Sequence, residues 1–205
     1  MSQTGLSQAK LVATYLAQTE FTLAISSDLA RALTTGQSIR DANPSFDDIE
    51  VWRVARERCF GKLEGQGVDN MLQEVKGKNK DQLFAWGPED GETGSQFRDR
   101  VRQFVKDLGK RVIKCKENES PTRVLVTTHG GFIKDFNMVM VNEFNCSMPC
   151  KDGEWGRICP NTGVSTYNMM LDEDGELLQK VVCTKLHYKG HLEGAEYNEP
   201  VLYGV

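Results

Sequence analysis

The chain has 205 residues, 39% of them hydrophobic and 26% charged, which is typical of a single globular domain, here residues 1–205. Its 25 Lys and Arg residues against 29 Asp and Glu residues give a formal net charge of −4, so no overall positive field draws it to nucleic acid or to an anionic membrane. The apolar runs are far shorter than the roughly 20 residues that cross a bilayer, and no signal peptide pattern is present. We therefore expect a cytoplasmic protein without a membrane span.

The chain contains six cysteines without a CxxC pair, and no other feature indicates an oxidising compartment. We therefore expect free thiols, as in cytosolic proteins. Cys146, Cys150 and Cys159 could join a histidine in a zinc site, but their spacings are irregular compared with those of known zinc ligands. The sequence favours a protein that needs neither a metal nor another cofactor.

The N-terminal third alternates between helix and strand. Apolar residues at helical spacing predict a helix over residues 4–17, and an alternating pattern predicts a strand over residues 21–26. Polar residues 26–28 provide N-cap chemistry for a second helix, which Asn43–Pro44 ends. Another strand is expected over residues 49–54.

The middle of the chain is rich in loops and leads into the strongest helix. A short helix is expected over residues 68–75, and the Gly- and Pro-rich residues 86–91 are expected to form a surface lid or connector. Residues 93–114 have one apolar face and one basic face, and therefore predict a long amphipathic helix. We expect the basic face to be solvated; it consists of Arg98, Arg102, Lys106 and Lys110.

The C-terminal third adds a buried strand, a helix and a hairpin. Residues 123–128 predict the strand and residues 132–141 the helix, while residues 164–171 and 177–184 predict an antiparallel hairpin joined through Asp174–Gly175. The alternation predicts a three-layer α/β fold, with a mostly parallel sheet and helices on both faces. In such folds ligands bind beyond the C-terminal ends of the strands.

The first candidate site lies at such an end. In Ile25–Arg31 a strand ends, a helix begins, and Arg31 falls in the first turn of that helix. Free backbone N–H groups at a helix N-terminus and a guanidinium both bind phosphate oxygens, so Arg31 is a candidate phosphate ligand. An ordinary helix that is capped by Asp28 and carries an exposed arginine fits the same residues.

The second candidate is His129, which follows a predicted strand and precedes Gly130 and Gly131. The two glycines leave backbone room for a ligand, and imidazole titrates near neutral pH. His129 is therefore a candidate ligand-binding or catalytic residue. A histidine with a purely structural role is the alternative.

The third candidate is Glu57, which is flanked by Arg56 and Arg58. Its carboxyl group could act as the general acid for a leaving group, or it could belong to a surface ion pair. Cys59, beside Arg58, is an alternative nucleophile, but a reactive thiolate needs a positive and partly exposed setting that the sequence alone does not establish.

The order of these motifs resembles that of the histidine phosphatase, or phosphoglycerate mutase-like, superfamily over nearly the whole chain. The matching segments are Thr4–Ala9, Ser27-Asp28-Leu29-x-Arg31, Arg56-Glu57-Arg58 with Gly61 and Glu64-Gly65, Pro88-x-x-Gly91-Glu92-Thr93, and Thr128-His129-Gly130. Three more segments are similar to the TIGAR branch, which consists of fructose-2,6-bisphosphatases: Cys146–Pro149, Pro160–Gly163 and His191–Gly194.

The resemblance implies a phosphatase that works through a phosphohistidine, which water then hydrolyses. It implies that Arg31 clamps the phosphate oxygens, that Glu57 protonates the leaving alkoxide, and that His129 donates to a nonbridging oxygen. It also implies a sugar (bis)phosphate substrate such as fructose 2,6-bisphosphate, and hence a role in the regulation of glycolysis. The expected partner is this small phosphorylated metabolite, bound by a monomer.

The chain departs from the family pattern in one respect. The family opens with an interior strand that ends in Arg-His-Gly, whose histidine is the nucleophile, whereas the histidines here are His129, His187 and His191. We therefore expect an N-terminally truncated domain that lacks the first strand. Such a chain should be nearly inactive, and marginally stable because the neighbouring strands lose backbone partners.

Two other functions fit parts of the sequence. A nonenzymatic relative could keep an anion site at Arg31 and His129 and act by binding a phosphorylated metabolite or a protein partner. A nucleotide-binding α/β module could use the turn at residues 129–131, although the sequence has no phosphate loop with a lysine.

Overall fold

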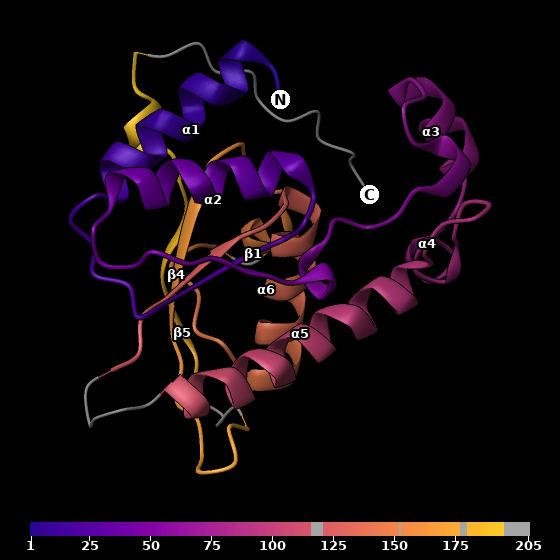
Figure 1. Ribbon diagram of the computed structural model, residues 1–205. Helices are drawn as coiled ribbons and strands as arrows, with labels where there is room; N and C mark the ends of the chain where they lie inside the picture. Colours follow the sequence, from indigo (N-terminus) through magenta and orange to yellow (C-terminus); the bar gives the residue numbers. More distant parts are fainter. Residues whose placement is uncertain (116–120, 152, 177–179, 195–205) are drawn as a thin grey trace.

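The computed structural model describes residues 1–115, 121–151, 153–176 and 180–194 (Figure 1). Its N-terminal elements are α1 (Gln3–Leu16), β1 (Leu23–Ser26), α2 (Ala30–Ala42), β2 (Glu50–Val51), the 3₁₀ turns η1 (Arg53–Ala55) and η2 (Gly61–Leu63), α3 (Val68–Val75) and α4 (Lys80–Ala85). They are followed by α5 (Gly94–Cys115), β3 (Val124–Thr127), α6 (Gly130–Phe144), η3 (Glu154–Gly156), β4 (Val164–Asn168), β5 (Val182–Tyr188) and η4 (Gly190–Leu192). No helix of these described ranges is both long and apolar enough to span a membrane.

A parallel sheet lies at the centre of the fold, with the strand order β2-β1-β3. Ser26 at the end of β1 is in register with Val51 of β2 and with Thr127 of β3. Because the strands are parallel, their C-terminal ends meet at one edge of the sheet. The segments that follow β1 and β3, which carry two of the candidate sites, therefore start next to each other.

Helices cover both faces of this sheet, as Figure 1 shows. Side chains of β1 alternate between two cores: Leu23 and Ile25 pack with residues of α5 and α6, whereas Ala24 packs with residues of α1 and α2. Phe104 of α5 and Phe132 of α6 meet edge to face at 5.2 Å between ring centroids and are almost fully buried. Burial of each ring contributes about 2–3 kcal/mol. The predicted three-layer α/β fold is confirmed.

The antiparallel hairpin is also confirmed, but its second strand lies further along the chain than predicted. The ladder of β4 and β5 runs from Val164↔Tyr188 to Asn168↔Val182. The predicted turn at Gly175 forms, with a φ of +82°. Its carbonyl oxygen packs closely on Gly109 of α5: a Cβ at position 109 would lie only 1.9 Å from this oxygen. This contact holds the turn at Gly175 against α5, so the turn is not part of the β4–β5 ladder. Residues 177–179, which belong to the predicted strand, lie outside the described residues.

The hairpin is a separate sheet in the described part of the chain. There, β3 is paired only with β1, and β4 only with β5. Residues of β4 and β5 nevertheless pack against both cores. The two sheets are therefore joined by side-chain packing, and not by a backbone ladder.

The structure differs from the local predictions in three places. The strand predicted over residues 49–54 ends at Val51, because the chain turns into η1, where the carbonyl oxygen of Val54 accepts a hydrogen bond from Arg100. Helix α4 was missed, although Asn79 and Gln82 form a capping box at its start. The basic face of α5 is only partly solvated, since two arginines tie α5 to α6 through the pairs Arg98–Asp135 and Arg102–Glu143.

Candidate functional site

The segment after β1 carries the first candidate residue, Arg31. The N-cap of α2 is Leu29, which makes no side-chain cap, and Arg31 lies exposed in the first turn. Asp28 does not cap the helix, because both its carboxylate oxygens accept hydrogen bonds from Arg56, at 2.6 Å each. This pairing lowers the pKa of Asp28. The alternative in which Asp28 is an ordinary helix cap is therefore wrong.

The segment after β3 carries His129, which is the N-cap of α6 and only 5% exposed. Its Nε2 lies 2.9 Å from Oγ of Ser27, a serine that is fully buried. Burial, together with the positive charges of Arg31 and Arg100, lowers the pKa of His129 to about 3. The imidazole is therefore neutral at physiological pH.

Glu57 lies at the N-terminus of α6, in contact with the two-glycine motif. Its Oε2 accepts a hydrogen bond from the amide of Gly131 at 2.9 Å, and its Oε1 from the amide of Arg58 at 3.0 Å. Burial raises the pKa of Glu57, although these two amides and the charge of Arg31 act in the opposite direction. A Cβ at Gly131 would lie 2.5 Å from Oε1. Position 131 therefore requires glycine if Glu57 is to stay where it is.

Four contacts tie the three motifs together at one edge of the sheet. The first two are His129 with Ser27 and Glu57 with Gly131. The pair Asp28–Arg56 joins the segment after β1 to the segment after η1. Thr128, directly after β3, adds another link, since its hydroxyl donates to the carbonyl oxygen of Ala55 at 2.7 Å. Arg31 starts from the same edge of the sheet, in the first turn of α2 after β1, and its charge lowers the pKa of both Glu57 and His129.

Sequence reasoning missed Arg100, whose guanidinium holds the loop that carries Glu57. It donates to the carbonyl oxygens of Val54, Arg56 and Glu57, at 2.9, 2.7 and 3.1 Å. Its other two bonds go to the carboxylate of Glu92, at 2.8 and 2.6 Å, and that carboxylate also accepts from the amide of Cys59. A signal was present in the sequence: Arg100 interrupts the apolar stripe of α5, three residues after the buried Phe97.

Residues 86–91, predicted to be a surface lid or connector, form a connector packed against the same loop. Its turn closes through the amide of Gly91 and the carbonyl oxygen of Pro88, at 2.9 Å. Backbone bonds then join Lys62 to Glu89, at 3.0 Å, and Glu92 to Cys59, at 2.9 Å. The loop of Glu57 is thus held from α5 on one side and from this connector on the other.

The cysteines and histidines outside the site show no metal-binding arrangement in the part of the chain that the structure describes. Burial raises the pKa of Cys146, and that of Cys159 to about 12, so neither thiol ionises readily. The thiol of Cys59 contacts the carbonyl oxygen of Asp90, at 3.8 Å.

The site therefore combines an exposed guanidinium, a buried neutral imidazole and a half-buried carboxyl group with a raised pKa. These are the groups that bind an anion and deliver a proton beside it. The family model of the histidine phosphatase superfamily (branch 1) matches residues 1–176 of the chain. The chain belongs to the histidine phosphatase superfamily.

Known proteins resemble the chain over most of its length. Fructose-2,6-bisphosphatase TIGAR of Xenopus tropicalis is 25% identical over 234 aligned residues, which cover 94% of this chain and 85% of the relative. A solved mycobacterial glucosyl-3-phosphoglycerate phosphatase has a TM-score of 0.73 at 20% identity, and 92% of this chain and 87% of that one are covered. The same enzyme in complex with inorganic phosphate has a TM-score of 0.71 at 18% identity, with coverages of 93% and 88%. The solved structures support the fold.

Proposed function

We propose that this site belongs to a phosphatase that hydrolyses a sugar (bis)phosphate such as fructose 2,6-bisphosphate through a phosphohistidine intermediate, and thereby helps to regulate glycolysis. The observation that carries the proposal is the convergence of Arg31, Glu57 and His129 at one edge of the sheet. Membership of the family supports the reaction class. The TIGAR relatives, which are named as fructose-2,6-bisphosphatases, support the substrate.

Each of the three side chains has a chemical part in this proposal. Arg31 binds the phosphoryl oxygens from the exposed first turn of α2, with the free N–H groups of that turn beside it. His129 is neutral before substrate binds, so it offers a hydrogen bond to a nonbridging oxygen without repelling Arg31. Glu57, whose pKa is raised by burial, keeps a proton to a higher pH than an exposed glutamate and delivers it to the leaving alkoxide.

The reaction needs a histidine that attacks phosphorus, and it proceeds in two steps. In the first, an imidazole nitrogen forms a bond to phosphorus while the bond to the sugar oxygen breaks, and that oxygen takes the proton of Glu57. In the second, the oxygen of a water forms a bond to phosphorus while the bond between phosphorus and the imidazole nitrogen breaks; Glu57 takes the proton of the water, and phosphate leaves. None of the three histidines of the chain follows an arginine. We therefore infer that the 205-residue chain binds phosphate but has negligible turnover.

A second candidate follows from the same observation about the histidines. A nonenzymatic relative that binds a phosphorylated metabolite would keep Arg31 and His129 and would not need an Arg-His-Gly motif. Both candidates require anion binding at this site, and they differ in turnover.

The binding experiment is calorimetric titration of the 205-residue chain with inorganic phosphate and with fructose 2,6-bisphosphate. We expect Arg31→Gln and His129→Gln to weaken phosphate binding by about tenfold or more, because each removes a donor to the anion. The matched control is Arg40→Gln, on the same helix but paired with Asp41 near its other end. Equal affinities of the Arg31 and Arg40 variants would overturn the proposed site.

Turnover is tested with substrate carrying ³²P at the scissile position. We expect no labelled protein after an acid-free quench and denaturing electrophoresis, and no release of phosphate above the uncatalysed rate. Label trapped on any residue of this chain would refute the inference of negligible turnover. Binding and hydrolysis that resist both site substitutions would refute the assigned roles.

A further inference from the structure

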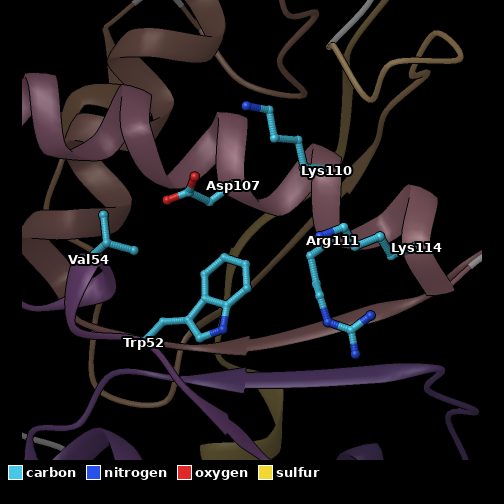
Figure 2. Close-up of a pocket in the computed structure, with 6 residues that line it drawn as sticks. All are labelled: Trp52, Val54, Asp107, Lys110, Arg111 and Lys114. Carbon is cyan, nitrogen blue, oxygen red and sulfur yellow. The ribbon is translucent and has the colours of Figure 1, made fainter.

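A concave site lies between α5 and the segment that follows β2, and Figure 2 shows it. Its volume is about 390 Å³, within the range of cavities that hold small ligands. The residues that line it are Trp52, Val54, Asp107, Lys110, Arg111 and Lys114. We name this cavity the Trp52 pocket. None of Arg31, Glu57 and His129 lines it.

The Trp52 pocket carries positive charge that the described residues only partly neutralise. Lys110 and Lys114 are exposed and form no ion pair with any residue that the structure describes. They are four residues apart on α5, where like charges repel each other. The third cation, Arg111, forms an ion pair with Glu50, with 2.7 Å between Nε and Oε1. Asp107 is the single acidic residue among those that line the pocket. An anion bound between the two lysines would relieve their repulsion.

An aromatic ring stands in the same cavity, and its orientation is fixed. The indole N–H of Trp52 donates to Oε2 of Glu50 at 3.1 Å, and the ring packs edge to face on Phe104, with 5.8 Å between centroids. Figure 2 shows the ring in the space between Asp107 and Arg111. A ring that is held in advance loses little conformational freedom when a planar ligand packs against it.

We propose that the Trp52 pocket binds a nucleoside di- or triphosphate. The phosphates lie between Lys110 and Lys114, and the base packs on Trp52. Neither the aromatic ring nor the two lysines belongs to the phosphatase machinery, so this site is separate from the proposed active site. Along α5, Lys110 is ten residues from Arg100, or about 15 Å at the rise of an α-helix.

The test uses calorimetric titration of the 205-residue chain with ATP, pyrophosphate and adenosine. We expect one ATP per chain, weaker binding at high salt, and affinities for pyrophosphate and adenosine at least about tenfold lower, since each supplies only half of the contacts. Lys110→Gln and Lys114→Gln should each weaken ATP binding about three- to tenfold. The matched control is Lys106→Gln, an exposed lysine on the same helix that does not line the pocket.

The outcomes separate this proposal from the proposed active site. Retention of ATP affinity by the Arg31→Gln variant, together with its loss in the Lys110 and Lys114 variants, supports a nucleotide site in the Trp52 pocket. Loss of ATP binding in the Arg31 variant would overturn it, because the nucleotide would then occupy the active site. Pyrophosphate that binds as tightly as ATP would overturn the nucleotide class, and so would equal affinities of the three lysine variants.

Discussion

The replacement of Arg100 by glutamine tests whether one guanidinium holds the loop of Glu57. Arg100 donates to three backbone carbonyl oxygens of that loop and pairs with Glu92. The substitution leaves the carboxylate of Glu92 without its cation and the carbonyl groups without their donor. Removal of one partner of a buried ion pair costs about 3–5 kcal/mol. Since the two side chains are 20% and 22% exposed, we expect the lower end, about 3 kcal/mol.

The assay is urea unfolding at neutral pH, followed by far-ultraviolet circular dichroism. Arg102→Gln is the matched control, because Arg102 lies on the same helix and pairs with Asp99 and Glu143, but is 40% exposed. Exposed pairs contribute little, so we expect this variant to lose about 0.5 kcal/mol. Arg100→Lys should fall between the two, since an ammonium keeps the charge but cannot match the planar fork of donors.

One result would refute this reasoning. If Arg100→Gln and Arg102→Gln lowered the free energy of unfolding by the same amount, within about 0.5 kcal/mol, the loop would be held by other contacts. The connector at residues 86–91, with Glu92 directly after it, would then be the main support, through the backbone bonds from Lys62 to Glu89 and from Glu92 to Cys59.

Three further predictions concern the site and the sheet. The pKa of His129 is lowered from 6.5 to about 3 on folding, so the unfolded chain binds more protons between these pH values and stability falls as the pH decreases. Between pH 7 and pH 5 this effect lowers the free energy of unfolding by about 2 kcal/mol. In urea unfolding of His129→Gln, the change in the free energy of unfolding between these pH values should be smaller by that amount. Gly131→Ala should lower the free energy of unfolding by about 1–3 kcal/mol, because its Cβ displaces Glu57 from the amide. The control is Gly156→Ala, where a Cβ would meet nothing within 4 Å, and it should change the free energy of unfolding by less than about 0.5 kcal/mol. Equal effects of the two substitutions would contradict the role of the contact between Gly131 and Glu57. Because β3 and β4 each pair on one side only within the described residues, we expect a free energy of unfolding below about 5 kcal/mol. A cooperative melt of a soluble monomer above about 65 °C would contradict that expectation.

The sequence predicted the layers of the fold better than the ends of its strands. The layers follow from periodicity, and β1 shows why, since Leu23 and Ile25 face one core and Ala24 the other. The boundaries depend on contacts between distant residues, which periodicity does not contain. The second strand of the hairpin starts later than predicted, beyond the turn at Gly175, which packs on Gly109, 66 residues earlier in the chain.

The candidate site was predicted by the order of its motifs and not by any single motif. Arg31, Glu57 and His129 each had a structural alternative in the sequence, and only their joint occurrence resembled a family. What the sequence did not predict is the support of these residues. The partners Ser27 and Gly131 lie within the motifs themselves, but their contacts join residues that are 102 and 74 positions apart.

Three of the places where local rules failed lie next to the site. Asp28 has the chemistry of a helix cap but pairs with Arg56, Arg100 is a charged residue in an apolar stripe, and residues 52–54 leave the strand that their pattern predicts. Each departure costs local stability and fixes part of the loop that carries Glu57. Such conflicts between local preference and tertiary structure are expected where a protein positions functional groups. The same conflicts therefore identify Arg100 as part of the support of the site, which no motif in the sequence did.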